Sequence, residues 1–287
     1  MAEQVTLAII GGSGLYTMPG LKDTREYTLD TPFGKTSAPI VVGTLEGMRV
    51  AFLARHGIGH HITPGEVPYL ANIYALKSMG VQRIISISAC GSLKEELIPG
   101  HIVIPDQIYD NTHARARSFF GEGMVAHISV ADPFCPDTSS QLETAVRAAG
   151  GEVHRGGTFI TIEGPRFSTK GESLTYRSWG MSIIGMTAAP EAFLAREAEI
   201  CYATMAHITD YDVWHESEAP VTVEMVLQTL HKNTSLAQEA VRLLVKNLRP
   251  ERNCDCKHAL SMALITRKDA IPPSTLQKLD LLVNKYL

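Results

Sequence analysis

The stretch of sequence that decides the fold reads ICYATMAHITDYD over residues 200–212. Residues 200–208 are almost continuously apolar, which is typical of a strand that is buried on both faces. Strands of this kind occur in sheets that helices cover on both sides. The stretch therefore predicts an α/β fold, with the polar residues 209–212 at the carboxyl end of a central strand.

Other apolar runs have the length of strands and alternate with amphipathic segments that have the length of helices. We expect further strands at residues 5–10, 40–45, 49–54, 83–89, 101–105, 158–162 and 181–186. We expect helices at residues 63–80, 137–150, 190–197, 222–248 and 273–286. The first helix would begin at a capping box, TPGE over residues 63–66, while Asp137 and Thr222 would cap the second and the fourth. A hairpin at residues 46–48 would make the sheet mixed rather than all-parallel.

The composition is that of an ordinary globular protein and excludes several other classes. The 287 residues are 45% hydrophobic and 20% charged, with a net charge of −4. No apolar run is long enough to cross a membrane, and no basic excess favours nucleic acid or an acidic membrane surface as a partner. Because the N-terminal residues lack the cationic start of a signal peptide, we expect a cytoplasmic protein.

No repeat, linker or composition break divides the chain before about residue 250. We therefore expect one domain over residues 1–250, built on a mixed central β-sheet flanked by helices. Residues 251–287 would form a C-terminal helical extension of the same domain.

The five cysteines are too few for a disulfide scaffold in a chain of this length. Cys90, Cys135 and Cys201 have apolar neighbours in the sequence and are expected to be core thiols. Cys254 and Cys256 lie in a polar segment, where they could be exposed thiols, a redox-linked pair or a disulfide. A zinc site would need two more ligands, and only His258 is near in the sequence, so we expect no metal.

Three polar segments with the chemistry of anion binding follow predicted strands. The first, GGSG at residues 11–14, lets the backbone approach an anion, although a simple tight turn would use the same residues. It is no dinucleotide fingerprint, because Thr17 and Pro19 stand where glycine would be needed. The second holds Arg55 and His56, which could clamp an oxyanion with a bidentate guanidinium fork or form an ordinary surface loop. The third is SACGS at residues 88–92.

Two later segments have the chemistry of a site for a heterocyclic base. Residues 163–168, EGPRFS, follow a strand and offer an aromatic face. Asp210 and Asp212 end the long apolar strand, where they could form a solvated turn. Alternatively, one could act as a general acid with a raised pKa while the other accepts a hydrogen bond.

Seven motifs in this order resemble the trimeric purine nucleoside phosphorylase family over about residues 5–248. They are GGSG (11–14), DTPFG (30–34), ARHG (54–57), ACGS (89–92), EGPRF (163–167), MT (186–187) and TDYD (209–212). The likeness is greater to the members that act on 5′-methylthioadenosine. It implies the nucleoside phosphorylase fold, with phosphorolysis of that nucleoside to adenine and 5-methylthioribose 1-phosphate. It also implies no cofactor besides phosphate as co-substrate, and a homotrimer that could pair into a hexamer.

The resemblance also implies a role for individual residues. Those that would hold phosphate are Ser13, Arg55, His56, Ser88, Ala89 and Thr187. Met186 would lie under the ribose, Phe167 would contact the purine, and Asp210 and Asp212 would bind the base, with Asp210 as the proton donor. The 5′ pocket would be lined by Val223, Val226 and Leu227 and closed by His127 from a neighbouring subunit, although the apolar residues also suit a plain core helix.

The choice of base follows from two positions of the same family pattern. Family members that act on 6-oxopurines carry glutamate where this chain has Ser168 and asparagine where it has Asp210. A neutral Ser168 with two aspartates suits adenine. In a pocket without water, a base whose hydrogen bonds do not match is disfavoured by roughly 10⁴-fold relative to the base that matches.

Three alternatives remain open at this point. The chain could be a purine nucleoside phosphorylase acting on adenosine, inosine or guanosine. It could be a methylthioadenosine nucleosidase, which uses water and needs no phosphate clamp. It could also be a dinucleotide-binding module, against which the glycine spacing argues.

Overall fold

The structure is a computed structural model that describes residues 3–11, 18–215 and 222–287. Its strands are β1 (Leu7–Gly11), β2 (Lys22–Tyr27), β3 (Asp30–Thr31), β4 (Gly34–Lys35), β5 (Ile40–Leu45), β6 (Met48–Ala54), β7 (Arg83–Ser92), β8 (Ile102–Ile104), β9 (Gln107–Asn111), β10 (Val153–Arg155), β11 (Thr158–Ile162), β12 (Ile183–Gly185) and β13 (Cys201–Asp210). Its α-helices are α1 (Tyr69–Ser78), α2 (Pro136–Ala148), α3 (Lys170–Ser178), α4 (Ala188–Glu197), α5 (Val223–Asn247) and α6 (Pro273–Val283).

Within the described residues, 11 strands form one mixed sheet with β13 and β7 at its centre. The central path runs β10-β8-β13-β7-β1-β6-β5-β2. Strand β12 pairs with β7 and with β11, and β11 also pairs with β9. Strands β6, β1, β7 and β13 are mutually parallel, whereas β5 pairs antiparallel with β6 through the predicted hairpin. Because these parallel strands end at the same edge, the residues that follow β6, β7 and β13 come together.

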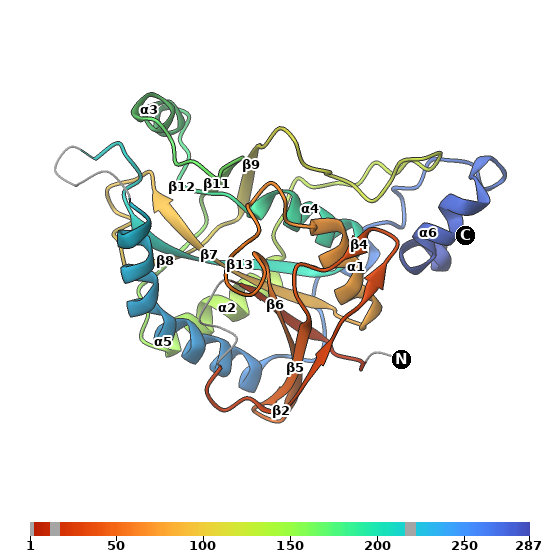
Figure 1. Cartoon of the computed structure of the whole chain (residues 1–287), viewed down its shortest axis with the longest axis horizontal. Coiled ribbons are helices and arrows are strands. Elements are labelled where there is room, and N and C mark those ends of the chain that lie inside the picture. Colours follow the sequence, from red (N-terminus) through yellow and green to blue (C-terminus); the bar gives the residue numbers. More distant parts are fainter. Residues whose placement is uncertain (1–2, 12–17, 216–221) are drawn as a thin grey trace.

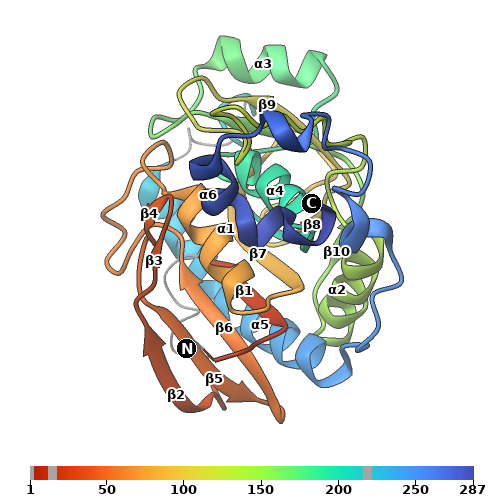
Figure 2. The same cartoon turned by 90° about the vertical axis from the view of Figure 1, so that its right-hand side faces the viewer.

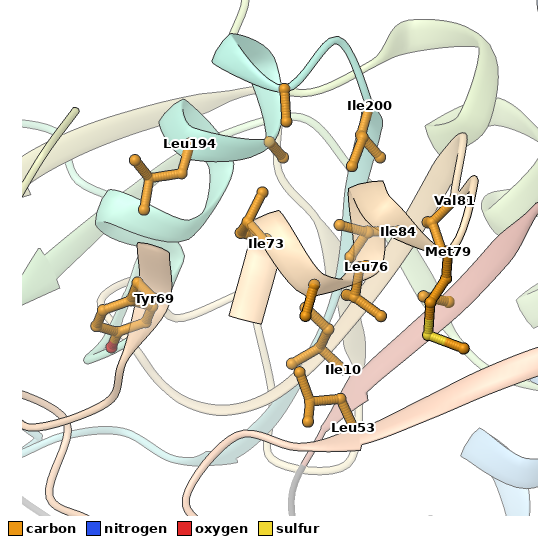
Figure 3. Close-up of a cluster of buried hydrophobic side chains, with 14 of the residues drawn as sticks. Ile10, Leu53, Tyr69, Ile73, Leu76, Met79, Val81, Ile84, Leu194 and Ile200 are labelled. Carbon is orange, nitrogen blue, oxygen red and sulfur yellow. The ribbon is translucent and has the colours of Figure 1, made fainter. Parts of the chain in front are cut away.

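Two helical layers cover the sheet, as the hydrophobic character of its strands predicts. Helices α1, α4 and α6 pack on one face, and α2 and α5 pack on the other (Figure 1). In the first layer, Ile73 and Leu76 of α1 and Leu194 of α4 belong to one apolar cluster with Ile10 and Ile84 of the sheet (Figure 3). These side chains are almost inaccessible to solvent, so the layer has a continuous apolar core.

The tail beyond residue 250 packs back on the molecule. Helix α6 lies beside α1 with the C-terminus nearby (Figure 2), and it buries Leu279, Leu282 and Val283 in the same core as α1. Among the described residues, no helix is long and apolar enough to cross a membrane.

The structure corrects three of the predicted element boundaries. The first helix begins at Tyr69 rather than at the TPGE segment, although Glu66 does accept a hydrogen bond from Thr63. The reason is Pro68, which disfavours helical geometry at the residue before it. Helix α2 is capped by the Cys135 side chain, so Asp137 lies inside its first turn. Strand β7 continues to Ser92 because β12 and β13 both pair with its last residues, so ACGS is not a free loop.

Candidate active site

A cavity of about 330 Å³ lies at the carboxyl edge of the parallel strands. It is bounded by the ends of β6, β7, β12 and β13, by the loop after β11 and by helix α5. Its lining includes most of the predicted site residues, namely Arg55, His56, Ser88, Ala89, Phe167, Ser168, Met186, Thr187, Asp210, Asp212, Val223 and Val226. The parallel register therefore brings segments from residues 55 to 226 into one site.

Arg55 is fully buried and most of its guanidinium group is already bound to protein. Nε and Nη2 form a two-pronged ion pair with the Glu191 carboxylate, each at 2.8 Å, and Nη2 also donates to Ser86 Oγ at 2.7 Å. Nη1 donates to the Ile87 carbonyl at 3.3 Å. The prediction of a bidentate clamp on an anion is therefore wrong, because the described residues occupy four of the five N–H groups of an arginine. Arg55 can offer an anion one N–H, while Glu191 balances its charge.

His56 follows Arg55 and is an uncharged ring at neutral pH. Burial and the neighbouring Arg55 charge lower the pKa of His56 to about 4. Nδ1 lies 2.9 Å from the Ile62 carbonyl, which can only accept, so Nδ1 carries the proton. Nε2 is then a hydrogen-bond acceptor. A neutral His56 therefore suits the P–OH group of hydrogen phosphate better than a bare phosphate oxygen.

Two hydroxyl groups face each other across the cavity wall. Ser88 of β7 and Thr187, which precedes α4, have their oxygen atoms 3.3 Å apart, and both residues are buried. Hydroxyl groups in this arrangement can donate to the same anion, and Ala89 lines the cavity next to them. Ser13, which was predicted to join this group, lies outside the described residues.

Asp210 and Asp212 are buried carboxyl groups at the end of β13. Burial raises the pKa of Asp210, and it raises that of Asp212 to about 6 with the help of the nearby Asp210 charge. Asp210 accepts hydrogen bonds at 2.7 Å from the Thr209 hydroxyl and from the Asp212 backbone N–H. These bonds hold the carboxyl in one orientation toward the cavity.

Gly91 of β7 explains how the carboxyl groups can lie so close to the neighbouring strand. A Cβ at this position would come within 2.9 Å of Asp210 Oδ1 and of Ile184 Cγ2. Real Cβ atoms essentially never make contacts this short, so a larger residue would displace Asp210. Gly91 of the ACGS motif therefore leaves room for the Asp210 carboxyl group, and it is not part of a free loop that binds an anion.

The rest of the cavity wall is largely apolar. Phe167 and Met186 are half-buried, while Val223 and Val226 come from the first turn of α5. The side chain of Leu227 is outside the described residues. His127 does not line this cavity, because its segment pairs with the tail through the His127 N–H and the Ala263 carbonyl at 2.9 Å.

Three buried polar residues at the site were missed by the sequence analysis. Glu191 neutralises Arg55, and Arg115 donates to the carbonyl groups of Glu163 and Met186 at 2.7 and 2.6 Å, which fixes the loops around the cavity. His207 of β13 lines the cavity, and neither of its ring nitrogens is hydrogen-bonded to any residue that the structure describes; burial lowers its pKa to about 4. Only His207 gave a signal in the sequence, as a titratable residue within an apolar strand.

A model of the phosphorylase superfamily matches residues 6–246 of the chain, which puts the protein in that class. The chain is 54% identical to the S-methyl-5′-thioadenosine phosphorylase of Geobacter sulfurreducens over 286 residues, covering 99% of this chain and 100% of the relative. The same enzyme of Koribacter versatilis is 51% identical, with 99% and 97% covered.

Solved structures agree with these sequence comparisons. A methylthioadenosine phosphorylase from an Antarctic soil metagenomic library has a TM-score of 0.93 at 47% identity, covering 98% of this chain and 99% of that one. The methylthioadenosine phosphorylase of Schistosoma mansoni, crystallised with adenine, has a TM-score of 0.86 at 36% identity, with 93% and 100% covered. The chain therefore belongs to the S-methyl-5′-thioadenosine phosphorylase family.

Proposed function

We propose that this protein catalyses the phosphorolysis of 5′-methylthioadenosine to adenine and 5-methylthioribose 1-phosphate. The observation that carries the proposal is the pair of buried carboxyl groups at the end of β13, which share one cavity with Arg55 and the Ser88–Thr187 hydroxyls. One cavity thus holds groups suited to a purine and groups suited to phosphate. The names of the relatives support the same substrate.

The base end of the cavity supplies a proton to the leaving group. As the C1′–N9 bond loosens, negative charge grows on adenine, and protonation at N7 neutralises it. Asp210 is our choice of donor, because burial favours its neutral form and hydrogen bonds fix its orientation. General-acid assistance of this kind contributes about 10²–10⁴-fold to the rate. Asp212 would accept a hydrogen bond from the N6 amino group.

The other end of the cavity would hold the nucleophile. Phosphate would receive hydrogen bonds from Ser88, Thr187 and the remaining N–H of Arg55, and it would donate its own P–OH to His56. Its charge would stabilise the oxocarbenium-like sugar as it attacks C1′. Ser13 and the backbone at Ala89 would complete this subsite. We propose no metal or organic cofactor for this reaction.

The sugar and its 5′ substituent would lie between these two ends. Met186 would contact the ribose and Phe167 the purine, and both border the cavity. The hydrocarbon of Val223 and Val226 suits a methylthio group better than a hydroxyl group. Leu227 is expected to add to the same surface.

We further propose that the active enzyme is a homotrimer, or two such trimers paired, in the cytoplasm. His127 does not line the cavity of its own chain, so we expect it to close the 5′ pocket of a neighbour. Mixing inactive His127→Ala and Asp210→Asn chains should then restore part of the activity through hybrid sites. A fully active monomer in sedimentation would refute this assembly.

A product assay with methylthioadenosine, adenosine and inosine tests the function directly. We expect release of adenine from methylthioadenosine only when phosphate is present, together with a pentose 1-phosphate, and weak use of inosine. Adenine release in phosphate-free buffer would instead indicate a nucleosidase. A preference for inosine would indicate a 6-oxopurine phosphorylase and contradict the roles of Asp210 and Ser168.

A further inference from the structure

Four of the five cysteines come together far from the active site. Cys135 caps α2, Cys201 is the first residue of β13, and Cys254 and Cys256 flank the start of a short 3-10 helix at Asp255–His258. Their sulfur atoms all lie within 4.8 Å of one another, and three of the four residues are buried while Cys254 is half-buried. A zinc site at Cys254 and Cys256 would need two more ligands, and the fold brings Cys135 and Cys201 to that place.

The arrangement has the dimensions of a tetrahedral metal cage. Zinc–thiolate bonds of about 2.3 Å place the four sulfurs of a regular tetrahedron about 3.8 Å apart. Cys201 Sγ and Cys254 Sγ lie 3.4 Å apart, and the 4.8 Å limit holds for every pair, so small side-chain adjustments would reach this geometry. All four sulfurs are near one another, as a single central ion requires.

Positive groups surround the sulfurs, as a cluster with excess negative charge needs. Arg196 Nη1 lies 3.4 Å from Cys256 Sγ, and Arg252 Nη1 lies 4.0 Å from Cys201 Sγ. The backbone N–H of Thr138 points at Cys135 Sγ from 3.5 Å. Four thiolates around Zn²⁺ carry a net charge of −2, and two guanidinium groups with N–H···S contacts would neutralise it.

We propose that Cys135, Cys201, Cys254 and Cys256 bind one Zn²⁺ in a closed structural site. Each thiol releases its proton to solvent as its sulfur–zinc bond forms, and no oxidation is involved. Four protein ligands leave no open position for a substrate. The ion would join the tail to the start of β13 and to α2. This departs from the expectation of no metal in the sequence analysis, which concerned only ligands near in the sequence.

The first test is the metal content of the whole protein, purified under reducing conditions without a chelator and analysed by mass spectrometry of the elements. We expect one zinc per chain, and a loss of most of it in Cys256→Ser. Cys90→Ser is the matched control, because Cys90 is buried but outside the cluster, and it should keep its zinc. Purified protein in which the four cysteines of the cluster are reduced thiols and no zinc is present, or in which they form disulfides, would overturn the proposal.

A second test uses the unmodified protein and needs no variant. The unmodified protein is stripped with a chelator under reducing conditions and then titrated with Co²⁺ alone. Tetrahedral thiolate coordination predicts an intense visible absorption that saturates at one ion per chain and disappears when Zn²⁺ is added. The stripped protein should also melt at a lower temperature and recover with Zn²⁺. No absorption from the reduced protein would refute the site.

Discussion

Strand β13 begins at Cys201 among thiols and arginine side chains, and it ends at Asp210 among carboxyl groups beside a cavity. All ten of its residues are buried, so neither end is tuned by contact with bulk water. At the first end, Arg196 and Arg252 place N–H groups beside the sulfurs of Cys256 and Cys201, while the Cys135 thiol and burial raise the pKa of both cysteines. At the second end, burial favours the neutral form of the carboxyl groups.

The difference shows how one strand can serve both stability and chemistry. Thiols that lie beside arginine side chains and one another suit a structural contact, whereas burial raises the pKa of a carboxyl group without a cationic partner and so favours the form that can donate a proton. The cavity does contain a cation in Arg55, but Glu191 neutralises it. If the two ends are as different and as independent as this, substitutions at each end should have separate effects.

The largest effect is expected from Asp210→Asn, which removes the transferable proton at the cavity end. Turnover of methylthioadenosine should fall by about 10²–10⁴-fold. Relative use of inosine should rise, because the new amide can donate to O6, and Ser168→Glu should increase it further by accepting from N1–H. The measurement is the ratio of specificity constants for inosine and adenosine in the single and double variants.

Asp132→Asn, on an exposed residue, is the control for the removal of a carboxylate and should retain normal turnover. An unchanged ratio of specificity constants in both active-site variants would show that Asp210 and Ser168 do not select the base.

Arg55→Met should cause the next largest effect, and should reduce stability as well as catalysis. The Glu191 carboxylate, 1% exposed, would be left without its partner, at a cost of about 3–5 kcal/mol. Denaturant unfolding should show this loss, and the double variant Arg55→Met/Glu191→Gln should recover part of it. If Arg55→Met raised only the phosphate requirement and left the unfolding midpoint unchanged, the ion pair would not be structural.

Acid should lower the stability of the folded protein through the buried His207 of β13. His207 has a folded-state pKa of about 4, below the usual 6.5. As the pH falls, the His207 ring therefore binds a proton in the unfolded chain before it does so in the folded protein. Stability is therefore fully present above about pH 6.5 and decreases as the pH falls toward 4, by up to roughly 3 kcal/mol for this residue. Unfolding free energies measured between pH 4 and 7 should show this slope.

His207→Leu should reduce the slope, whereas His113→Gln, at an exposed position, should leave it unchanged. Equal slopes in the wild type and His207→Leu would mean that His207 is protonated as readily in the folded protein as in the unfolded chain.

The smallest effect is expected at the thiol end, from Arg196→Met. The loss of its N–H···S contact with Cys256 should lower stability by about 0.5–1.5 kcal/mol. Turnover at moderate temperature should be normal, because β13 separates this end from Asp210 by roughly 30 Å of strand. Arg267→Met, on an exposed residue, is the control. A loss of turnover comparable to that of Asp210→Asn would show that the two ends are coupled.

Strong hydrophobic patterns were sufficient to locate the centre of the fold. Strand β11 and strand β5 lie at their predicted residues, and β13 differs from its prediction by one or two residues at each end. Strand β2 was missed because its residues are polar and mostly exposed, so they carry no hydrophobic pattern. Helix α3 was missed for a similar reason, because it buries only Ser173 and Tyr176.

The same distinction holds for the candidate site. Arg55, His56 and Asp210 could be predicted because they directly follow, or end, recognisable strands. Glu191 and Arg115 could not, because the partner of Glu191 lies 136 residues away along the chain and those of Arg115 lie 46 or more residues away.

The sequence by itself determined the class of fold, the edge of the sheet where the chemistry lies and the residue types available there. These properties depend on the spacing of apolar residues and on which residues follow each strand, and both can be read directly from a sequence. Tertiary structure alone decided that Glu191 occupies the fork of Arg55, that His207 faces the cavity, and that Cys135 and Cys201 meet Cys254 and Cys256. Charge, protonation and metal binding depend on distances of a few ångströms between residues far apart in the chain, and only folding sets those distances.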